Sequence, residues 1–319
     1  MKEKQHKKIR LSQYAIYLVM IALIVFFSIV ADGFFSSTTF FNILRQVAVN
    51  GIAAVGMTMV ILTGGIDISV GSLIGASSVG CAILMTTYHV NPIIAIVITL
   101  AFGLLVGLCN GFFIYEVKIP PMIATLASMS ILRGAAYILS DGLPVYDIPE
   151  EFAVLGQGYL GVIPVPVIIM TVCFVVGYFV LEHTSFGRYI YGIGSNLEAS
   201  RLSGVNVRKV MYSVYAICGT LASLAGIVYL SRVNSGQPKG GEGYEMDIIT
   251  AVVLGGVSTT GGEGKIARVI AGLVIMGVLM TGMTMKGIPD YYQRVVKGFV
   301  LLAAISYDIL SRRRIAEKG

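Results

Sequence analysis

The chain has 319 residues, of which 56% are hydrophobic and only 13% are charged, and its mean hydropathy is +0.83. Soluble globular proteins carry roughly a quarter of their residues as charged ones, so this composition excludes an ordinary soluble domain. It predicts an all-α polytopic membrane protein. The net charge of +6 does not indicate nucleic-acid binding, because the basic residues lie in short stretches between apolar runs.

Apolar runs along the chain predict about ten transmembrane helices. The first run follows a charged N-terminus, is long enough to span a membrane and has no small-residue cleavage site after it, so we interpret it as a retained helix. The eighth is too short to cross alone, and we expect flanking Gly-rich backbone to complete it. The ten segments are 12–31, 47–63, 70–87, 92–114, 121–139, 165–181, 210–231, 247–257, 269–285 and 295–310.

The distribution of positive charge supports this map, which was drawn from hydropathy alone. An even number of spans places both ends on one side, and the stretches on that side carry sixteen of the 23 Lys and Arg residues, against five on the other. The positive-inside rule therefore predicts that both termini are cytoplasmic. Arg133 and Lys297 make up the remainder, and we place them toward the outer ends of their spans, where long side chains can reach the interface.

The stretch "TGGIDISVGS", residues 63–72, interrupts the apolar sequence between the second and third spans. Irregular backbone at membrane depth is tolerated only where it is buried in protein or lines a watery cavity. Asp67 and Ser69 can cap the helix that starts near Val70, with the glycines as turn formers. The same break can line or gate a translocation path, and the two interpretations can hold together.

Further polar or glycine positions are candidates for such a path, because a neutral substrate is held by a few polar groups and by close backbone approach. A second Gly-rich break, "GGVSTTGG", follows the eighth span. The candidates for the path and the helix breaks are Gly64, Gly65, Asp67, Ser69, Ser72, Asn110, Gly255, Gly256, Gly261 and Gly262.

Residues 184–210 form the longest connection on the cytoplasmic side. The segment "SNLEASRL" predicts a short amphipathic helix, capped by Ser195 or Asn196 and with Glu198 in its first turn. Glycines on both sides are expected to act as flexible hinges, so that the helix can dock into a partner's groove. The alternative is a solvated positive-inside loop.

The chain carries no recognisable ATPase or catalytic motif. "GGEGKI" resembles a phosphate-binding loop, but Thr259 and Ile266 occupy positions where that loop needs Gly and Ser or Thr. Carboxylates within the spans are scarce, which argues against ion or proton coupling. Energy for uphill transport is therefore expected to enter from another subunit. The four cysteines have no short pair spacing, and no disulfide or metal site is predicted.

These motifs resemble those of the permease subunit of ribose-type sugar ABC importers. The resemblance also includes the segments "GLCNGFF" at 107–113, "KIPPMIATLASMSILRGAAYILSDG" at 118–142 and "LGGVSTTGGEGK" at 254–265. Those permeases belong to the wider ribose and branched-chain amino acid permease group. The resemblance implies one transmembrane permease domain over 1–319 in the bacterial inner membrane, paired with a second permease as a homodimer or heterodimer. It also implies a cytoplasmic ATPase that uses ATP, an extracytoplasmic sugar-binding protein and no cofactor in this chain.

The resemblance further makes residues 184–210 the region that couples the permease to the ATPase, with a small neutral sugar of the ribose-like class as substrate. A self-sufficient secondary transporter or facilitator for a small polar solute is the alternative, since ten helices with breaks are equally compatible with it. The coupling residues implied are Gly187, Arg188, Gly194, Asn196, Ala199, Arg201 and Gly204.

Overall fold

The computed structural model describes the backbone of residues 2–316 and the side chains of residues 16–310. Within that part of the chain, the regular elements are helices and one hairpin of two short antiparallel strands, in which Tyr159 pairs with Pro164 and Leu160 with Ile163. The elements are α1 (Lys2–Val30), α2 (Ser37–Leu62), α3 (Val70–Thr86), α4 (Pro92–Tyr115), α5 (Pro121–Leu139), the 3-10 helix η1 (Glu150–Ala153), α6 (Val154–Gln157), β1 (Tyr159–Leu160), β2 (Ile163–Pro164), α7 (Val165–His183), α8 (Ser185–Ser195), α9 (Leu197–Leu202), α10 (Val207–Val233), α11 (Tyr244–Leu254), α12 (Ile266–Met285) and α13 (Asp290–Ala316).

Six helices among the described residues are long and apolar enough to cross a membrane, namely α2, α4, α5, α7, α10 and α12. Two shorter apolar helices accompany them, α3 and residues 16–30 of α1. With 11 residues, α11 is about 16 Å long, which is only half of a bilayer core. Length and composition therefore support six candidate spans among the described residues, and the ten that we expected stay a prediction.

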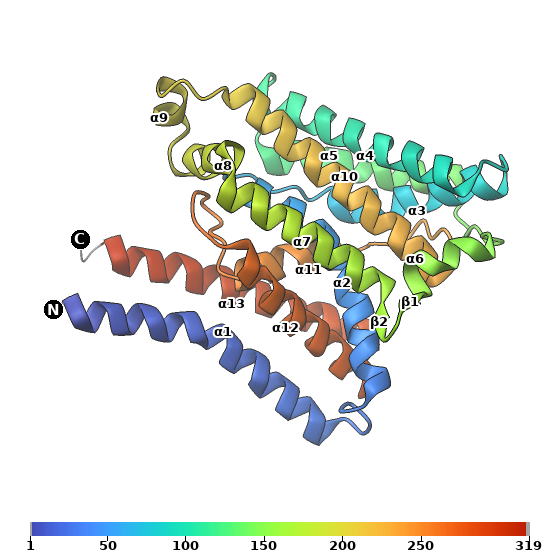
Figure 1. Ribbon diagram of the computed structural model, residues 1–319, viewed down its shortest axis with the longest axis horizontal. Helices are drawn as coiled ribbons and strands as arrows, with labels where there is room; N and C mark the ends of the chain where they lie inside the picture. The colour runs from blue at the N-terminus through green and yellow to red at the C-terminus, as the bar shows by residue number, and fades with distance from the viewer. Residues whose placement is uncertain (1, 317–319) are drawn as a thin grey trace.

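The long helices lie side by side and share two ends (Figure 1). The start of α1, the end of α13 and the short helices α8 and α9 gather at one end, and α6 with the β1–β2 hairpin lies at the other. Helix α10 packs against α2, α3 and α4, while α11 packs against α2 and α12. Helix α1 lies at the edge of the bundle against α12.

Small residues allow a close contact between α4 and α10. A Cβ built on Gly107 would overlap the backbone of Tyr215 and Ala216, and one on Gly219 would overlap the carbonyl oxygen of Gly103. Lipid is as apolar as a leucine side chain, so helices in a membrane gain most by such close backbone approach. Gly103 and Gly107 therefore lie at close-packing positions between the two helices.

Residues 234–243 connect α10 to α11 and run back into the bundle. After α10, residues 235–243 turn back along α3, with Gly236 near Ala82 at one end of the segment. Toward the other end, a Cβ on Gly71 would lie 2.6 Å from the carbonyl oxygen of Gly241, so the two backbones touch. Helix α11 consequently begins beside the first turn of α3, inside the bundle.

Candidate functional site

Helices α2 and α11 end in the same way, at the two breaks seen in the sequence. After α2, the N–H of Gly64 donates to the Ile61 carbonyl at 2.9 Å and that of Gly65 to the Val60 carbonyl at 3.1 Å. After α11, the corresponding bonds from Gly256 and Val257 are 2.8 and 3.3 Å long. Gly64 and Gly256 have φ of +81° and +82°, the left-handed conformation of a Schellman stop, which glycine adopts without a steric cost.

Three glycine-containing segments that are distant in sequence meet at one point, which we call the glycine junction (Leu62, Gly64, Gly194, Gly261 and Gly262). The N–H of Gly262 donates to the Leu62 carbonyl at 2.9 Å. A Cβ on Gly194 would overlap both of these groups, and one on Gly261 would lie 2.8 Å from the Gly64 nitrogen. Helix α8 therefore touches both helix breaks directly.

Gly255 and Gly65 lie close to the junction but contact other elements. A Cβ on Gly255 would lie 2.7 Å from the Cα of Val269 in α12, and one on Gly65 would overlap the hydroxyl of Tyr215 in α10. Both glycines are close-packing positions at the ends of the breaks.

The connection 184–210 contains two helices and not the single one that we expected. The cap prediction is confirmed, because Asn196 Oδ1 accepts from the Ala199 N–H at 2.9 Å and Glu198 lies in the first turn of α9. The hinge prediction is wrong for Gly187 and Gly194, which lie within α8 and are packed against backbone, Gly187 against Leu181. Close packing leaves these glycines no room to flex.

Helix α8 is fixed to the bundle. Ile190 and Ile193 are buried, and the hydroxyl of Tyr191 donates to the Gly264 carbonyl at 3.0 Å. Burial, assisted by the negative charge of Glu182, raises the pKa of Tyr191 to about 12. The phenol therefore keeps its proton and its hydrogen bond at physiological pH.

Helix α9 presents its charged side chains outward. Glu198 and Arg201 form an ion pair of 2.9 Å with side chains 65% and 63% exposed. Leu202 is 83% exposed, and Gly204, with φ +84°, ends the helix in open space. The Arg188 guanidinium donates to the Ser185 hydroxyl at 2.8 Å on the exposed side of α8. The exposed helix α9 thus follows directly after α8, which is packed against the bundle and contacts both helix breaks.

Asp67, Ser69 and Asn110 come together in a buried network at the start of α3. Asp67 Oδ1 accepts from the Ser69 N–H at 2.9 Å and from its hydroxyl at 2.5 Å. The Asn110 side chain donates to Ser69 Oγ at 3.1 Å, and Ser128 Oγ donates to Asn110 Oδ1 at 2.5 Å. Thr125 Oγ1 accepts from the Ile68 N–H at 3.2 Å. The network joins the first break to α4 and α5.

Asp67 does not occupy the cap position of α3 but lies two residues before it. Ser69 occupies the N-cap position, and its side chain makes no capping hydrogen bond. Asp67 instead holds the turn before the helix through both Ser69 groups. Three of the predicted path residues, Asp67, Ser69 and Asn110, are each 1% exposed and are bonded to one another, whereas Ser72 lies apart from them in a separate pocket.

The placement of the two charges within the spans needs correction, because neither Arg133 nor Lys297 simply extends to an interface. Arg133 Nη1 donates to the carbonyls of Pro238 and Gly240 at 2.9 and 2.8 Å. Lys297 Nζ lies 2.7 Å from Asp247 Oδ2. Pro238 and Gly240 belong to the segment that turns back along α3, and Asp247 belongs to α11, the helix after it. More than forty residues separate each pair in the chain, and sequence reasoning missed them for that reason.

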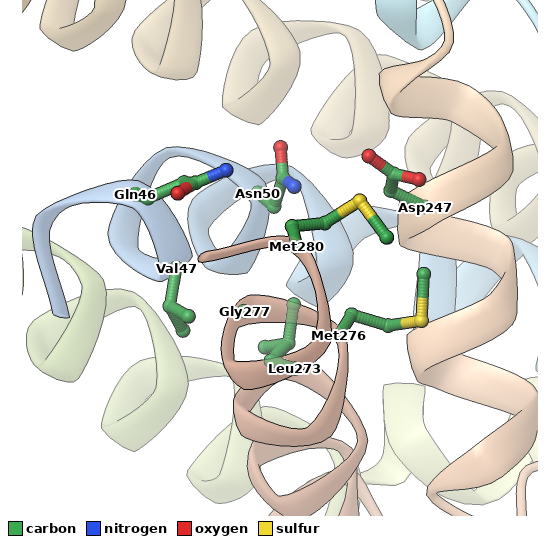
Figure 2. Close-up of a pocket in the computed structure, with 8 residues that line it drawn as sticks. All are labelled: Gln46, Val47, Asn50, Asp247, Leu273, Met276, Gly277 and Met280. Carbon is green, nitrogen blue, oxygen red and sulfur yellow. The ribbon is translucent and has the colours of Figure 1, made fainter. Parts of the chain in front are cut away.

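A small cavity of about 10 Å³ adjoins Asp247. Figure 2 shows Gln46 and Asn50 projecting from α2, Asp247 from α11, and Met276 and Met280 from α12 around it. Asn50 Oδ1 and Asp247 Oδ1 are buried and have no hydrogen-bond partner among the described residues. The space suits one water molecule donating to both oxygens.

Comparisons with known proteins agree on the class of the chain. The profile of the family described as "Branched-chain amino acid transport system / permease component" matches residues 39–305. The chain is 42% identical to the ribose import permease protein RbsC of Escherichia coli, over 91% of this chain and 92% of the relative. It is also 42% identical to RbsC of Bacillus subtilis, over 92% and 91%. The xylose transport system permease protein XylH of Escherichia coli is 33% identical, over 97% and 94%. No solved structure matches the chain.

Proposed function

The chain belongs to the family of branched-chain amino acid transport system permease components, and on that premise we propose that it is the membrane-spanning subunit of an ATP-driven importer for a small neutral sugar. The relatives that it matches over more than nine-tenths of both chains are named for ribose and xylose. The substrate is accordingly a monosaccharide of the ribose-like class. Catalysis of ATP hydrolysis belongs to a separate ATPase.

In this proposal ten segments cross or enter the membrane. The six long spans are joined by α1 and α13 at the edge and by the shorter α3 and α11 inside the bundle. Irregular backbone next to α3 and α11 is buried against other helices, which is the condition for such backbone at membrane depth. The charge bias assigns the end with α8, α9 and both termini to the cytoplasm.

The glycine junction is the observation that carries the mechanism. Helix α8 touches both helix breaks by backbone, so a force applied to the α8–α9 unit reaches α2 and α11 through rigid contacts. An ATPase that docks on the exposed α9 would therefore move the ends of the two broken helices. Coupling of this kind is reciprocal between the nucleotide state and the access state.

The remaining partners follow from the same function. A sugar-binding protein would deliver substrate at the end that carries α6 and the β1–β2 hairpin. A second permease, identical or related, would complete the path. The outward faces of α4 and α5, largely exposed in the single chain, are covered by lipid or by that subunit.

Uptake by reconstituted vesicles tests the proposal. Vesicles that contain the chain, its ATPase and its binding protein should accumulate labelled ribose or another pentose only when ATP is inside the compartment that holds the ATPase. Vesicles with the chain alone should show no uptake. Equal uptake by the chain alone would instead establish a self-sufficient facilitator.

A further inference from the structure

A second polar pocket, which we call the outer polar pocket, lies between the first turn of α3, the second half of α5 and the start of α11. It has a volume of about 300 Å³ and is lined by Ser72, Ser130, Arg133, Tyr137, Glu242 and Glu245, among others. That volume is at the lower end of the range for small-molecule sites. The cavity in Figure 2, by contrast, has room for about one water molecule.

Two buried polar atoms in this pocket lack partners. Ser72 is 1% exposed, and its hydroxyl has no hydrogen-bond partner among the described residues. The same holds for Glu245 Oε2, whereas Glu245 Oε1 accepts from the Gly243 N–H at 3.2 Å. Leaving a buried hydroxyl and a carboxylate oxygen unpaired is costly, so both atoms call for a partner such as a bound solute or water.

The backbone around the pocket is built to admit the carboxylate. A Cβ on Gly71 would overlap Glu245 Oε2, so only glycine at position 71 leaves room for that oxygen. Arg133 holds the turned-back segment in position through its bonds to Pro238 and Gly240. Ionisable groups inside a membrane bundle are expensive and usually mark a solute pathway.

The position of the pocket along the bundle fits a transport site. Ser72 is near the start of α3, Arg133 is in the second half of α5, and Glu245 is in the first turn of α11, a helix that starts inside the bundle. Substrate sites of transporters typically lie near the bilayer midplane beside discontinuous helices. A cation at Arg133 and carboxylates at Glu242 and Glu245 offer both donors and acceptors, which a polyhydroxy solute can satisfy and a hydrocarbon cannot.

From this arrangement we propose that the outer polar pocket is the sugar-binding site of the permease, an inference that rests on the proposed function. Glu245 Oε2 accepts a hydrogen bond from one sugar hydroxyl. Ser72 Oγ donates to a neighbouring sugar oxygen. Arg133 and Glu242 contact further hydroxyls at the rim, and the Tyr137 ring, 39% exposed, offers an apolar face for the sugar's C–H groups.

Glu245→Gln and Ser72→Ala are the test variants, studied in the complete importer at matched amounts of assembled complex. Thr86→Ala is the control, because Thr86 lies outside the pocket at the other end of the helix that carries Ser72, and its hydroxyl donates to the Ala82 carbonyl at 3.0 Å. Two quantities are measured, the rate of ATP-driven ribose uptake and the rise in the thermal unfolding midpoint that millimolar ribose produces in the permease–ATPase complex without the binding protein.

Glu245→Gln is expected to lower uptake at least tenfold and Ser72→Ala several-fold, with the ribose-induced rise in midpoint lost in both and retained in Thr86→Ala. Hydrolysis of ATP without sugar should stay unchanged. Wild-type uptake and midpoint shift in all three variants would overturn the site while leaving the proposed function intact. A wild-type midpoint shift that Glu245→Gln removes, in a complex that imports no sugar, would support the site and refute import. A wild-type complex that imports ribose but shows no midpoint shift would overturn the site.

Discussion

Replacing Gly194 by Ala tests whether α8 transmits movement through the glycine junction. The new Cβ would overlap the Leu62 carbonyl oxygen and the Gly262 nitrogen, both of them backbone atoms that cannot rotate away. Overpacking costs about 1–3 kcal/mol, and separating the buried Gly262–Leu62 hydrogen bond adds about 1–3 kcal/mol. If about 1.4 kcal/mol of this strain falls only on the state in which permease and ATPase are coupled, that state becomes tenfold less populated and sugar-stimulated ATP hydrolysis drops accordingly.

The assay measures sugar-stimulated ATP hydrolysis in vesicles and the thermal midpoint of the permease–ATPase complex. Gly192→Ala is the matched control, two residues away in the same helix, where the nearest atom to the new Cβ is the movable Ser200 hydroxyl at 3.2 Å. It should gain about 0.5–1 kcal/mol of helix stability and keep its hydrolysis. If Gly194→Ala matches Gly192→Ala in both measurements, the junction does not transmit coupling and α8 is only packed there.

Three further variants probe the remaining parts of the proposal. Asp67→Ala should lower uptake more than it lowers the amount of complex, at a cost of about 1–3 kcal/mol for the lost bonds, and unchanged uptake at equal expression would leave Asp67 a purely structural role. Arg201→Glu should prevent co-purification with the ATPase at a folding cost of only about 0.5 kcal/mol from repulsion with Glu198; co-purification at the wild-type level would show that α9 does not dock. Lys297→Met should lower the free energy of unfolding by about 3–5 kcal/mol, because it leaves the buried Asp247 carboxylate without a partner. Adding Asp247→Asn should recover much of that loss. An unchanged free energy of unfolding in Lys297→Met would show that the pair is unimportant to stability.

The sequence alone determined the class of the molecule. Apolar runs of membrane length and the bias of basic residues depend only on local composition, and each expected segment overlaps a helix of the structure over most of its length. Local chemistry also located the breaks, since Gly64 and Gly256 stop helices through conformations that one residue can specify. The Asn196 cap is local in the same sense, because its partner is three residues away.

Contacts between distant segments were decided only by the tertiary structure. The sequence predicted Gly187 and Gly194 to be hinges, because it does not distinguish a glycine in a flexible loop from a glycine packed closely against a neighbouring backbone. The partners of Arg133 and Lys297 belong to the segment that turns back along α3 and to the helix that follows it. No local sequence pattern predicts that this segment turns back. The placement of Ser72 and Glu245 in one pocket depends on that same return. Local sequence fixes where a helix starts and stops, whereas which buried charges and backbones meet depends on how the helices pack together.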